Sequence, residues 1–155
     1  MIIWIDADAC PRGIKDIITK AALRLKIKVI LVANTPVGIP EHSLIEFVRV
    51  PNGMDVADQY IVEHCHTDDI VITADIPLAD RIVTKGAIGI NPRGEVYSTE
   101  SIREKLSVRN FMTDMRNAGI ISGGPKPFTN TDKRKFAATF DKIIMQKIIR
   151  KSSHK

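Results

Sequence analysis

The chain has 155 residues, of which 44% are apolar and 26% charged, a balance typical of one globular domain with a sizeable core. No apolar run reaches the roughly 18 residues that cross a bilayer, and no basic segment precedes the first apolar residues, so the sequence predicts neither a membrane span nor a signal peptide. Two cysteines, Cys10 and Cys65, are too few for a disulfide framework, and we expect a cytoplasmic protein.

Charge is divided unevenly along the chain. Residues 1–100 contain 10 Lys and Arg against 14 Asp and Glu, a net charge of −4. Residues 101–155 contain 13 against 4, a net charge of +9. Basic clusters attract nucleic acids mainly through the phosphates. The last third of the chain therefore predicts either a nucleic-acid-binding segment or a solvated basic helix.

Short runs rich in Ile and Val alternate with helical patterns over the first 98 residues. Strands are expected at 2–6, 27–33, 46–50, 69–73 and 87–90, and helices at about 12–26, 55–66 and 76–85. This alternation predicts an α/β fold with a mainly parallel sheet flanked by helices. The link 34–45 is short for a crossover helix, which leaves the place of the third strand open.

The remaining residues, 99–155, have a helical pattern. One helix is expected at about 99–118 with a break near Ser107, and a second begins at Thr131 or Asp132 as its N-cap. We therefore expect a single domain, residues 1–155, in which an α/β core of residues 1–98 carries a basic, helical C-terminal extension.

Aspartates gather where the expected strands end. Asp6 and Asp8 close the first run, Asp75 follows the fourth, and Asp55 and Asp58 open the middle helix. Ligands of parallel sheets bind beyond the carboxyl ends of the strands, where the strand order reverses. Carboxylate oxygens suit a hard divalent cation, so the pattern predicts an Mg²⁺ or Mn²⁺ site. The alternative for each residue is an ordinary role as a helix cap or turn former.

Four motifs, distinctive in combination, are spread over nearly the whole chain. They are Asp6-Ala7-Asp8-Ala9-Cys10-Pro11, Gly53-Met54-Asp55-Val56-Ala57-Asp58, Thr73-Ala74-Asp75-Ile76-Pro77-Leu78-Ala79 and Gly123-Gly124-Pro125. This combination resembles the bacterial YaiI/YqxD family, which is itself poorly characterised. The resemblance implies a PIN-like, Rossmann-like fold of the kind found in metal-dependent nuclease domains.

Within the PIN-like group, the chain is most similar to NYN-type domains. That resemblance implies a catalytic metal set of Asp6, Asp55 and Asp75, with auxiliary metal positions at Asp8 and Asp58. The chain departs from the NYN pattern after Asp75, where those nucleases often carry a second acid at close spacing. Here Ile76-Pro77-Leu78 follows instead, and the next acid is Asp80.

Four basic residues are candidates for substrate contacts. Arg93 follows the fifth expected strand, at the same edge as the aspartates. Lys126 lies beside the Gly-Gly-Pro loop, where backbone N–H groups could face an anion, and Lys133 and Arg134 begin the last helix. Their alternatives are a turn, an ordinary interhelical loop and a solvated helix start.

The favoured function is Mg²⁺- or Mn²⁺-dependent hydrolysis of phosphodiester bonds in RNA. One alternative is a non-catalytic metal- or nucleic-acid-binding module of PIN-like fold. Another is a phosphatase of the haloacid dehalogenase type, which also uses Asp-x-Asp after its first strand. That motif normally continues with Thr or Val two residues later, where this chain has Cys10, and the usual cap insertion is hard to place. The sequence leaves the oligomeric state open.

Overall fold

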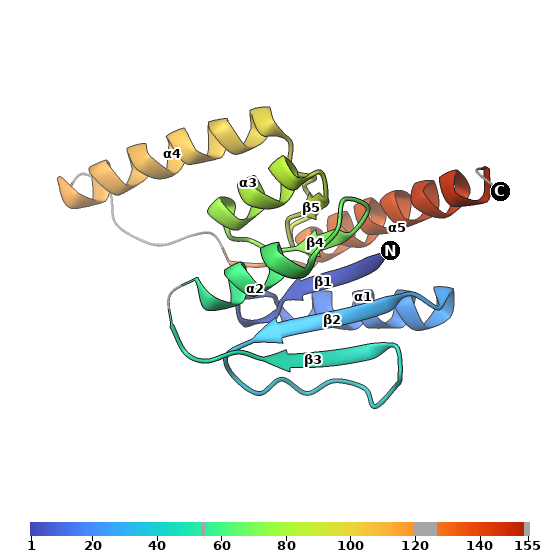
Figure 1. Ribbon diagram of the computed structural model, residues 1–155. Helices are drawn as coiled ribbons and strands as arrows, with labels where there is room; N and C mark the ends of the chain where they lie inside the picture. The colour runs from blue at the N-terminus through green and yellow to red at the C-terminus, as the bar shows by residue number, and fades with distance from the viewer. Residues whose placement is uncertain (54, 120–126, 154–155) are drawn as a thin grey trace.

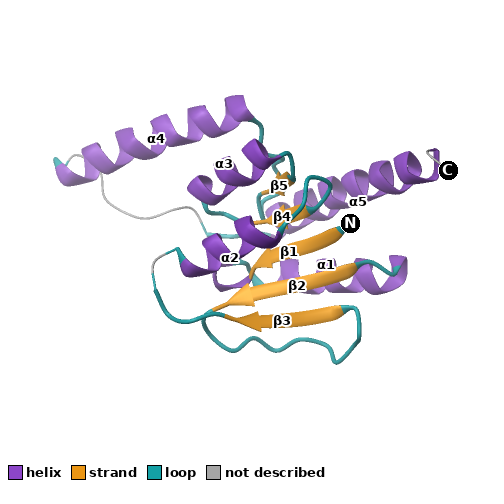
Figure 2. Ribbon diagram, viewed as in Figure 1, coloured by secondary structure: helices purple, strands orange, loops and turns teal. Residues whose placement is uncertain are grey.

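The chain folds around one parallel sheet (Figures 1 and 2). A computed structural model describes residues 1–53, 55–119 and 127–153. Within these residues, five strands lie in the order β3-β2-β1-β4-β5, and every neighbouring pair is parallel. The strands are β1 (Ile2–Asp6), β2 (Lys28–Ala33), β3 (Ile45–Arg49), β4 (Ile70–Ile72) and β5 (Ile88–Ile90). This confirms the predicted α/β class, a Rossmann-like parallel sheet flanked by helices, with each strand boundary within one residue.

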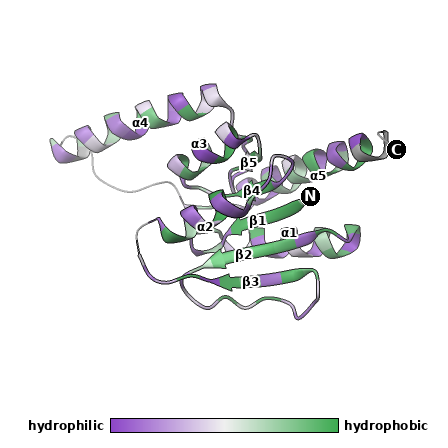
Figure 3. Ribbon diagram, in the orientation of Figure 1, coloured by the Kyte–Doolittle hydropathy of each residue, from purple (hydrophilic) through white to green (hydrophobic). Residues whose placement is uncertain are grey.

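The strands are apolar because helices cover both faces of the sheet (Figure 3). Helices α1 (Arg12–Leu25) and α5 (Asn130–Ser153) pack on one face, and α2 (Val56–His64) and α3 (Ile76–Lys85) on the other. On the first face the core includes Ile3, Ile5, Ile14, Ile18, Phe136 and Phe140. On the second it includes Trp4, Val71, Ile61, Leu78 and Ile82. The last helix of the C-terminal extension is therefore part of the core.

Helix α4 (Thr99–Asn117) packs against α3 and lies on its outer side, away from the sheet (Figure 1). Its first turn is fixed by reciprocal bonds, in which Ser98 N–H donates to Ser101 Oγ and Ser101 N–H donates to Ser98 Oγ. The predicted break near Ser107 is wrong, because the helix is continuous there. A serine costs a helix interior only about 0.5 kcal/mol relative to alanine, which is too little to end it.

The N-cap of α5 differs from the prediction. Thr129 Oγ1 accepts from Asp132 N–H at 3.2 Å, and Asp132 Oδ2 accepts from Thr129 N–H at 3.0 Å. This reciprocal pair is a capping box, so Thr129 is the N-cap and Asp132 lies three residues inside the helix. The hydrogen bonds that the Asp132 carboxylate accepts, chiefly from the Thr129 backbone N–H and then from the Thr129 hydroxyl, lower the pKa of Asp132.

The link between β2 and β3 contains neither helix nor strand in residues 34–44. Val37 and Ile39 of this link pack against the core on the α1 face, so the irregular segment covers apolar surface as a crossover helix would. The third strand pairs in parallel with β2 at the edge of the sheet. Among the described helices, none has the length and apolar character needed to cross a membrane.

The strand order reverses at β1. The chain first places β2 and β3 on one side of β1, and after α2 it returns to place β4 on the other side. Ile5 pairs with Ile72, so Asp6 at the end of β1 is opposite the first residue after β4, Thr73. The carboxyl ends of β1 and β4 are thus the topological switch point, where ligands of such sheets bind.

Candidate metal site at the switch point

Asp6 is the buried carboxylate at the centre of the switch point, with 6% of its surface exposed. Thr73 Oγ1 donates a hydrogen bond of 2.8 Å to Asp6 Oδ2, and the same hydroxyl accepts from Asp75 N–H at 3.0 Å. Burial raises the pKa of Asp6, the bond from Thr73 lowers it, and the charges of Asp75 and Asp8 raise it, with a net increase. The site therefore resists a full negative charge on Asp6 unless a cation is present.

Thr73 is a site residue that the sequence analysis did not single out. Its side chain joins Asp6 to Asp75, and its carbonyl accepts from the Tyr97 hydroxyl at 3.0 Å. Asn91 Nδ2 in turn donates to that hydroxyl at 3.0 Å. Its position could have indicated a site role, because Thr73 lies directly after a buried strand and two residues before Asp75.

Asp75 is both a helix cap and a candidate ligand. Its Oδ1 accepts from Leu78 N–H at 2.9 Å, which caps α3 as the simpler alternative expected. Its Oδ2 receives no hydrogen bond from the residues that the structure describes. Because the cap uses one oxygen, the second stays available for an ion.

Asp58, in the first turn of α2, interacts electrostatically with the aspartates at the carboxyl edge of the sheet. Burial first, and then the charges of Asp75, Asp6 and Asp55, raise the pKa of Asp58 to about 6, against a smaller lowering by Arg81. No described residue donates a hydrogen bond to its carboxylate. Asp58 is therefore coupled to the switch point and has both oxygens open to a ligand.

Asp55 occupies the N-cap position of α2, but its side chain makes no capping bond. Its backbone is left-handed, with φ 63° and ψ 11°. An L-residue other than glycine pays roughly 1 kcal/mol or more for this conformation, although aspartate tolerates it better than most. The capping explanation for Asp55 thus lacks its hydrogen bond, and the side chain is exposed, with its charge acting on Asp58.

Asp8 has a different role from the other four aspartates. It lies in the 3₁₀ turn η1 (Ala7–Ala9), and its Oδ2 accepts from Asn34 N–H at 2.8 Å while its Oδ1 accepts from Thr35 Oγ1 at 2.9 Å. Asp8 thereby anchors the segment that follows β2. A metal role for Asp8 stays a prediction, and it would require one of these bonds to be given up.

A purely structural carboxylate in the same chain offers a comparison. Asp69, before β4 at the opposite edge, is 3% exposed and accepts hydrogen bonds from Ile2 N–H, Trp4 Nε1–H and His66 N–H at 2.9–3.0 Å. Both of its oxygens are therefore satisfied by protein. Asp6, equally buried, receives one hydrogen bond from the described residues. Asp6 thus lacks the donors that a structural buried carboxylate gathers.

The donor set fits a hard cation by its chemistry, since every candidate ligand is a carboxylate oxygen. Among the described residues, however, no group of three Asp, Glu, His or Cys side chains is arranged to hold a metal ion as it stands. Burial first, and then the charges of neighbouring aspartates, raise the pKa values of Asp6 and Asp58. A cation at this edge would favour the charged form of both carboxylates.

The predicted substrate-contacting residues lie around the start of α5. Arg93 Nη1 forms an ion pair with Asp132 Oδ2 at 2.7 Å and donates to the Pro127 carbonyl at 3.3 Å. The Lys133 side chain lies over Gly13 in the first turn of α1, and Arg134 is exposed. Lys126, with the Gly-Gly-Pro loop, falls outside the described residues. Arg93 thus fastens α5 beside the carboxyl edge of the sheet.

The shifted pKa of Asp58 predicts a pH-dependent stability. A carboxyl whose pKa is raised from 3.8 to about 6 on folding binds its proton more tightly in the folded state, so the free energy of unfolding falls as pH rises between these values. The full shift corresponds to about 3 kcal/mol, and exposure to solvent reduces it to about 1–2 kcal/mol. In the metal-free protein, Asp58→Asn should therefore stabilise by about 1–2 kcal/mol at pH 7.5 and by almost nothing at pH 4.

Urea denaturation at both pH values, in the presence of a chelator, measures this effect. Asp80→Asn is the matched control, because Asp80 is exposed on α3 and makes no hydrogen bond with a described residue. Equal stability changes for the two variants at pH 7.5 would mean that Asp58 does not share the field of the switch point.

The sheet order and its acidic edge define a Rossmann-like α/β protein with a candidate metal site at the topological switch point. The chain belongs to the family described as "Uncharacterized BCR, YaiI/YqxD family", which matches residues 4–146 and confirms the resemblance.

Curated relatives share this family membership. A UPF0178 protein of Maridesulfovibrio salexigens is 49% identical over 150 residues, covering 97% of this chain and 99% of its own. One of Trichlorobacter lovleyi is 51% identical over 144 residues, covering 93% and 94%. One of Marinomonas sp. is 51% identical over 148 residues, covering 96% and 99%. No solved structure matches the chain.

Proposed function

We propose that this protein is a divalent-metal-dependent nuclease of PIN-like type that hydrolyses phosphodiester bonds in RNA. The observation that carries the proposal is the meeting of Asp6 and Asp75 at the switch point, where Thr73 joins them and where burial and neighbouring carboxylates raise the pKa of Asp6 and of Asp58. Carboxylates whose pKa is raised by burial together with a specific neighbouring charge are often found at functional sites. The family relatives bear no activity in their names, so the proposal rests on the site.

Asp6, Asp55 and Asp75 would hold Mg²⁺ or Mn²⁺, with Thr73 fixing the first and last of them. When bound, the ion would polarise a phosphate and lower the pKa of a bound water. Asp58 is better suited than Asp8 to orient that water. No described residue donates a hydrogen bond to the Asp58 carboxylate, whereas both oxygens of Asp8 accept from Asn34 and Thr35.

The basic start of α5 would hold the RNA backbone. Lys133 lies against the first turn of α1, which follows the Asp6 strand, and Arg134 is exposed next to it. Arg93 and Lys126 belong to the same proposed surface. A cytoplasmic setting completes the proposal, in keeping with two cysteines that are buried and free.

The direct test is cleavage of end-labelled single-stranded RNA, duplex RNA and DNA by the purified protein with Mn²⁺, with Mg²⁺ and with a chelator. The proposal expects cleavage of RNA that requires the metal. Binding of metal and RNA without cleavage would instead identify a non-catalytic module. An acid-stable acyl phosphate on Asp6, formed from a small phosphate ester, would identify the phosphatase.

A second prediction concerns the salt dependence of RNA binding. Lys133→Ala combined with Arg134→Ala should weaken binding and flatten the plot of log K against log salt concentration by about 1.4–1.8, because each lost phosphate contact removes about 0.7–0.9. Filter binding or fluorescence anisotropy from 50 to 300 mM salt measures the slope.

The control is a charge-matched pair, Lys20→Ala with Lys142→Ala, since both lysines are exposed away from the start of α5. Metal binding should be unchanged in both double variants. An equal decrease of the slope in the control would show that RNA binding depends on the net charge of the protein and not on the basic residues at the start of α5.

A further inference from the structure

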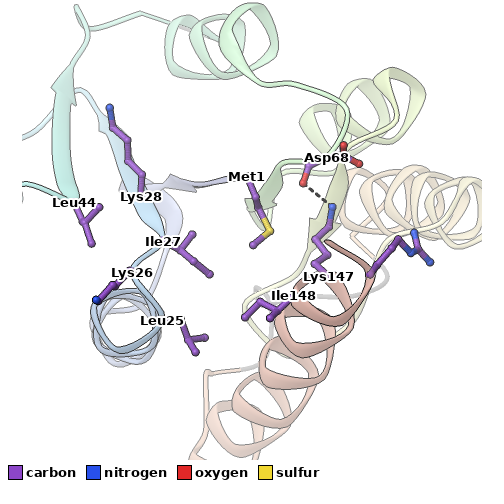
Figure 4. Close-up of a pocket in the computed structure, with 10 residues that line it drawn as sticks. Met1, Leu25, Lys26, Ile27, Lys28, Leu44, Asp68, Lys147 and Ile148 are labelled. Atoms are coloured by element: carbon purple, nitrogen blue, oxygen red, sulfur yellow. Dashed lines mark hydrogen bonds between the residues drawn. The ribbon is translucent and has the colours of Figure 1, made fainter. Parts of the chain in front are cut away.

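A hollow lies at the amino-terminal edge of the sheet, opposite the switch point (Figure 4). Its volume is about 770 Å³. It arises because α5 has 24 residues and α1 only 14. Lys133 lies against Gly13, and Arg24 pairs with Asp141 at 3.9 Å, so the two helices run side by side. The part of α5 beyond Asp141 therefore projects past the end of α1.

The inner surface of this hollow is aliphatic. Leu25 and Ile27 line it at the end of α1, Ile148 lines it from α5, and Met1 and Leu44 complete it. In Figure 4 the tips of Leu25, Ile27, Met1 and Ile148 face a common space. No aromatic ring is among the described lining residues, so the hollow offers no stacking platform for a nucleobase. It suits a flexible hydrocarbon chain.

The rim of the hollow is cationic. It carries Lys26, Lys28, Lys147 and Arg150, of which Lys28 pairs with Glu46 at 3.3 Å, and Asp68 is the one acid among the described lining residues. Lys147 Nζ donates to the Asp68 backbone carbonyl at 2.6 Å. Burial lowers the pKa of Lys147, against a smaller raising by the charges of Asp68 and Asp69. Arg150 forms no ion pair with a described acid. The rim therefore carries positive charge that an anion would balance.

We propose that this hollow binds a free amphiphilic anion with an unbranched aliphatic chain, whose head group lies at Lys147 and Arg150 and whose chain lies along Leu25, Ile27 and Ile148. The volume is within the range of about 300–1,000 Å³ that small-molecule sites occupy. This ligand site is independent of the proposed nuclease function, because it lies at the opposite edge of the sheet.

Isothermal titration calorimetry with decanoate, kept below its micelle concentration, tests the proposal in the intact protein. We expect saturable binding of one decanoate. Octanoate should bind about tenfold more weakly, since each buried methylene contributes about 0.8 kcal/mol. Decyltrimethylammonium, with a chain of similar length and the opposite charge, should not bind. Equal binding of decanoate and decyltrimethylammonium, or binding only to anionic phosphatidylglycerol vesicles, would overturn the proposal.

Two variants locate the ligand. Ile148→Trp should fill the hollow and abolish binding, and Arg150→Gln, which changes an exposed side chain, should weaken it roughly tenfold through loss of one charge-assisted contact. Lys142→Gln, on an exposed part of the same helix, should leave decanoate binding unchanged. Full decanoate affinity in the folded Arg150→Gln variant, or no binding by the wild type, would refute the site.

Discussion

Gly94→Ala is expected to destabilise the protein by about 3 kcal/mol or more. Gly94 has φ +92°, and a Cβ there would lie 2.6 Å from Lys135 C and 2.7 Å from Phe136 N. These are backbone atoms of α5, so relief requires moving the helix. The left-handed conformation alone costs alanine about 1–2 kcal/mol, and displacement of Phe136 and Phe140 from the core adds a cost of the size of a large-to-small core substitution.

Chemical denaturation of three alanine variants separates these contributions. Gly38→Ala should be nearly neutral, because nothing lies within 4 Å of its Cβ and its backbone is unstrained. Gly119→Ala, at φ +74° with no described atom within 4 Å of the added Cβ, reports the conformational cost. If Gly94→Ala were no worse than Gly119→Ala, α5 would not be seated on this turn.

The same contact connects the fold with the proposed RNA surface. Thr139 Oγ1 donates to the Gly94 carbonyl at 2.7 Å, and the neighbouring Arg93 pairs with Asp132 at 2.7 Å. The turn after β5, residues 91–94, therefore contacts successive turns of the first half of α5. Lys133 is carried by that start. A substitution that weakens the contact between this turn and α5 should therefore reduce RNA binding more than metal binding by the aspartates that follow β1 and β4.

The sheet was predictable from sequence because its signals are local. A buried parallel strand is a short run of Ile and Val, and β4 is no more than Ile-Val-Ile. The edge where Asp6 and Asp75 meet was also predictable, because the carboxyl ends of parallel strands share an edge. That prediction required β1 and β4 to be neighbours in the sheet, and they pair in parallel.

What the sequence did not reveal depends on contacts between distant segments. Thr73 reaches Asp6 across 67 positions, and Asp8 reaches Asn34 across 26. Neither residue type allows its hydrogen-bond partner to be predicted, because threonine after a strand and aspartate in a turn are common without such a partner. The overhang of α5 beside the hollow at the amino-terminal edge follows from the relative lengths and the packing of α1 and α5, which no local sequence pattern encodes.

The largest functional effect is expected for Asp6→Asn. Cleavage of RNA should fall by roughly 100-fold or more, since even outer-shell changes at metal sites cost about 10–100-fold. The metal-free protein should be as stable as the wild type or more so, because the substitution removes a buried charge beside Asp75 and Asp8 while the amide oxygen still accepts from Thr73.

Thermal melts with and without Mn²⁺ decide between a ligand and a structural role for Asp6. An ion that binds only the folded state raises the melting temperature by mass action, and Asp6→Asn should remove most of that rise. Asp69→Asn is the informative contrast, because the Asp69 carboxylate accepts three hydrogen bonds from protein N–H groups. It should destabilise the metal-free protein by about 1–3 kcal/mol and leave the Mn²⁺ response intact. A large loss of metal-free stability in Asp6→Asn, matching that of Asp69→Asn, would assign Asp6 to the fold and remove the central ligand from the proposed site.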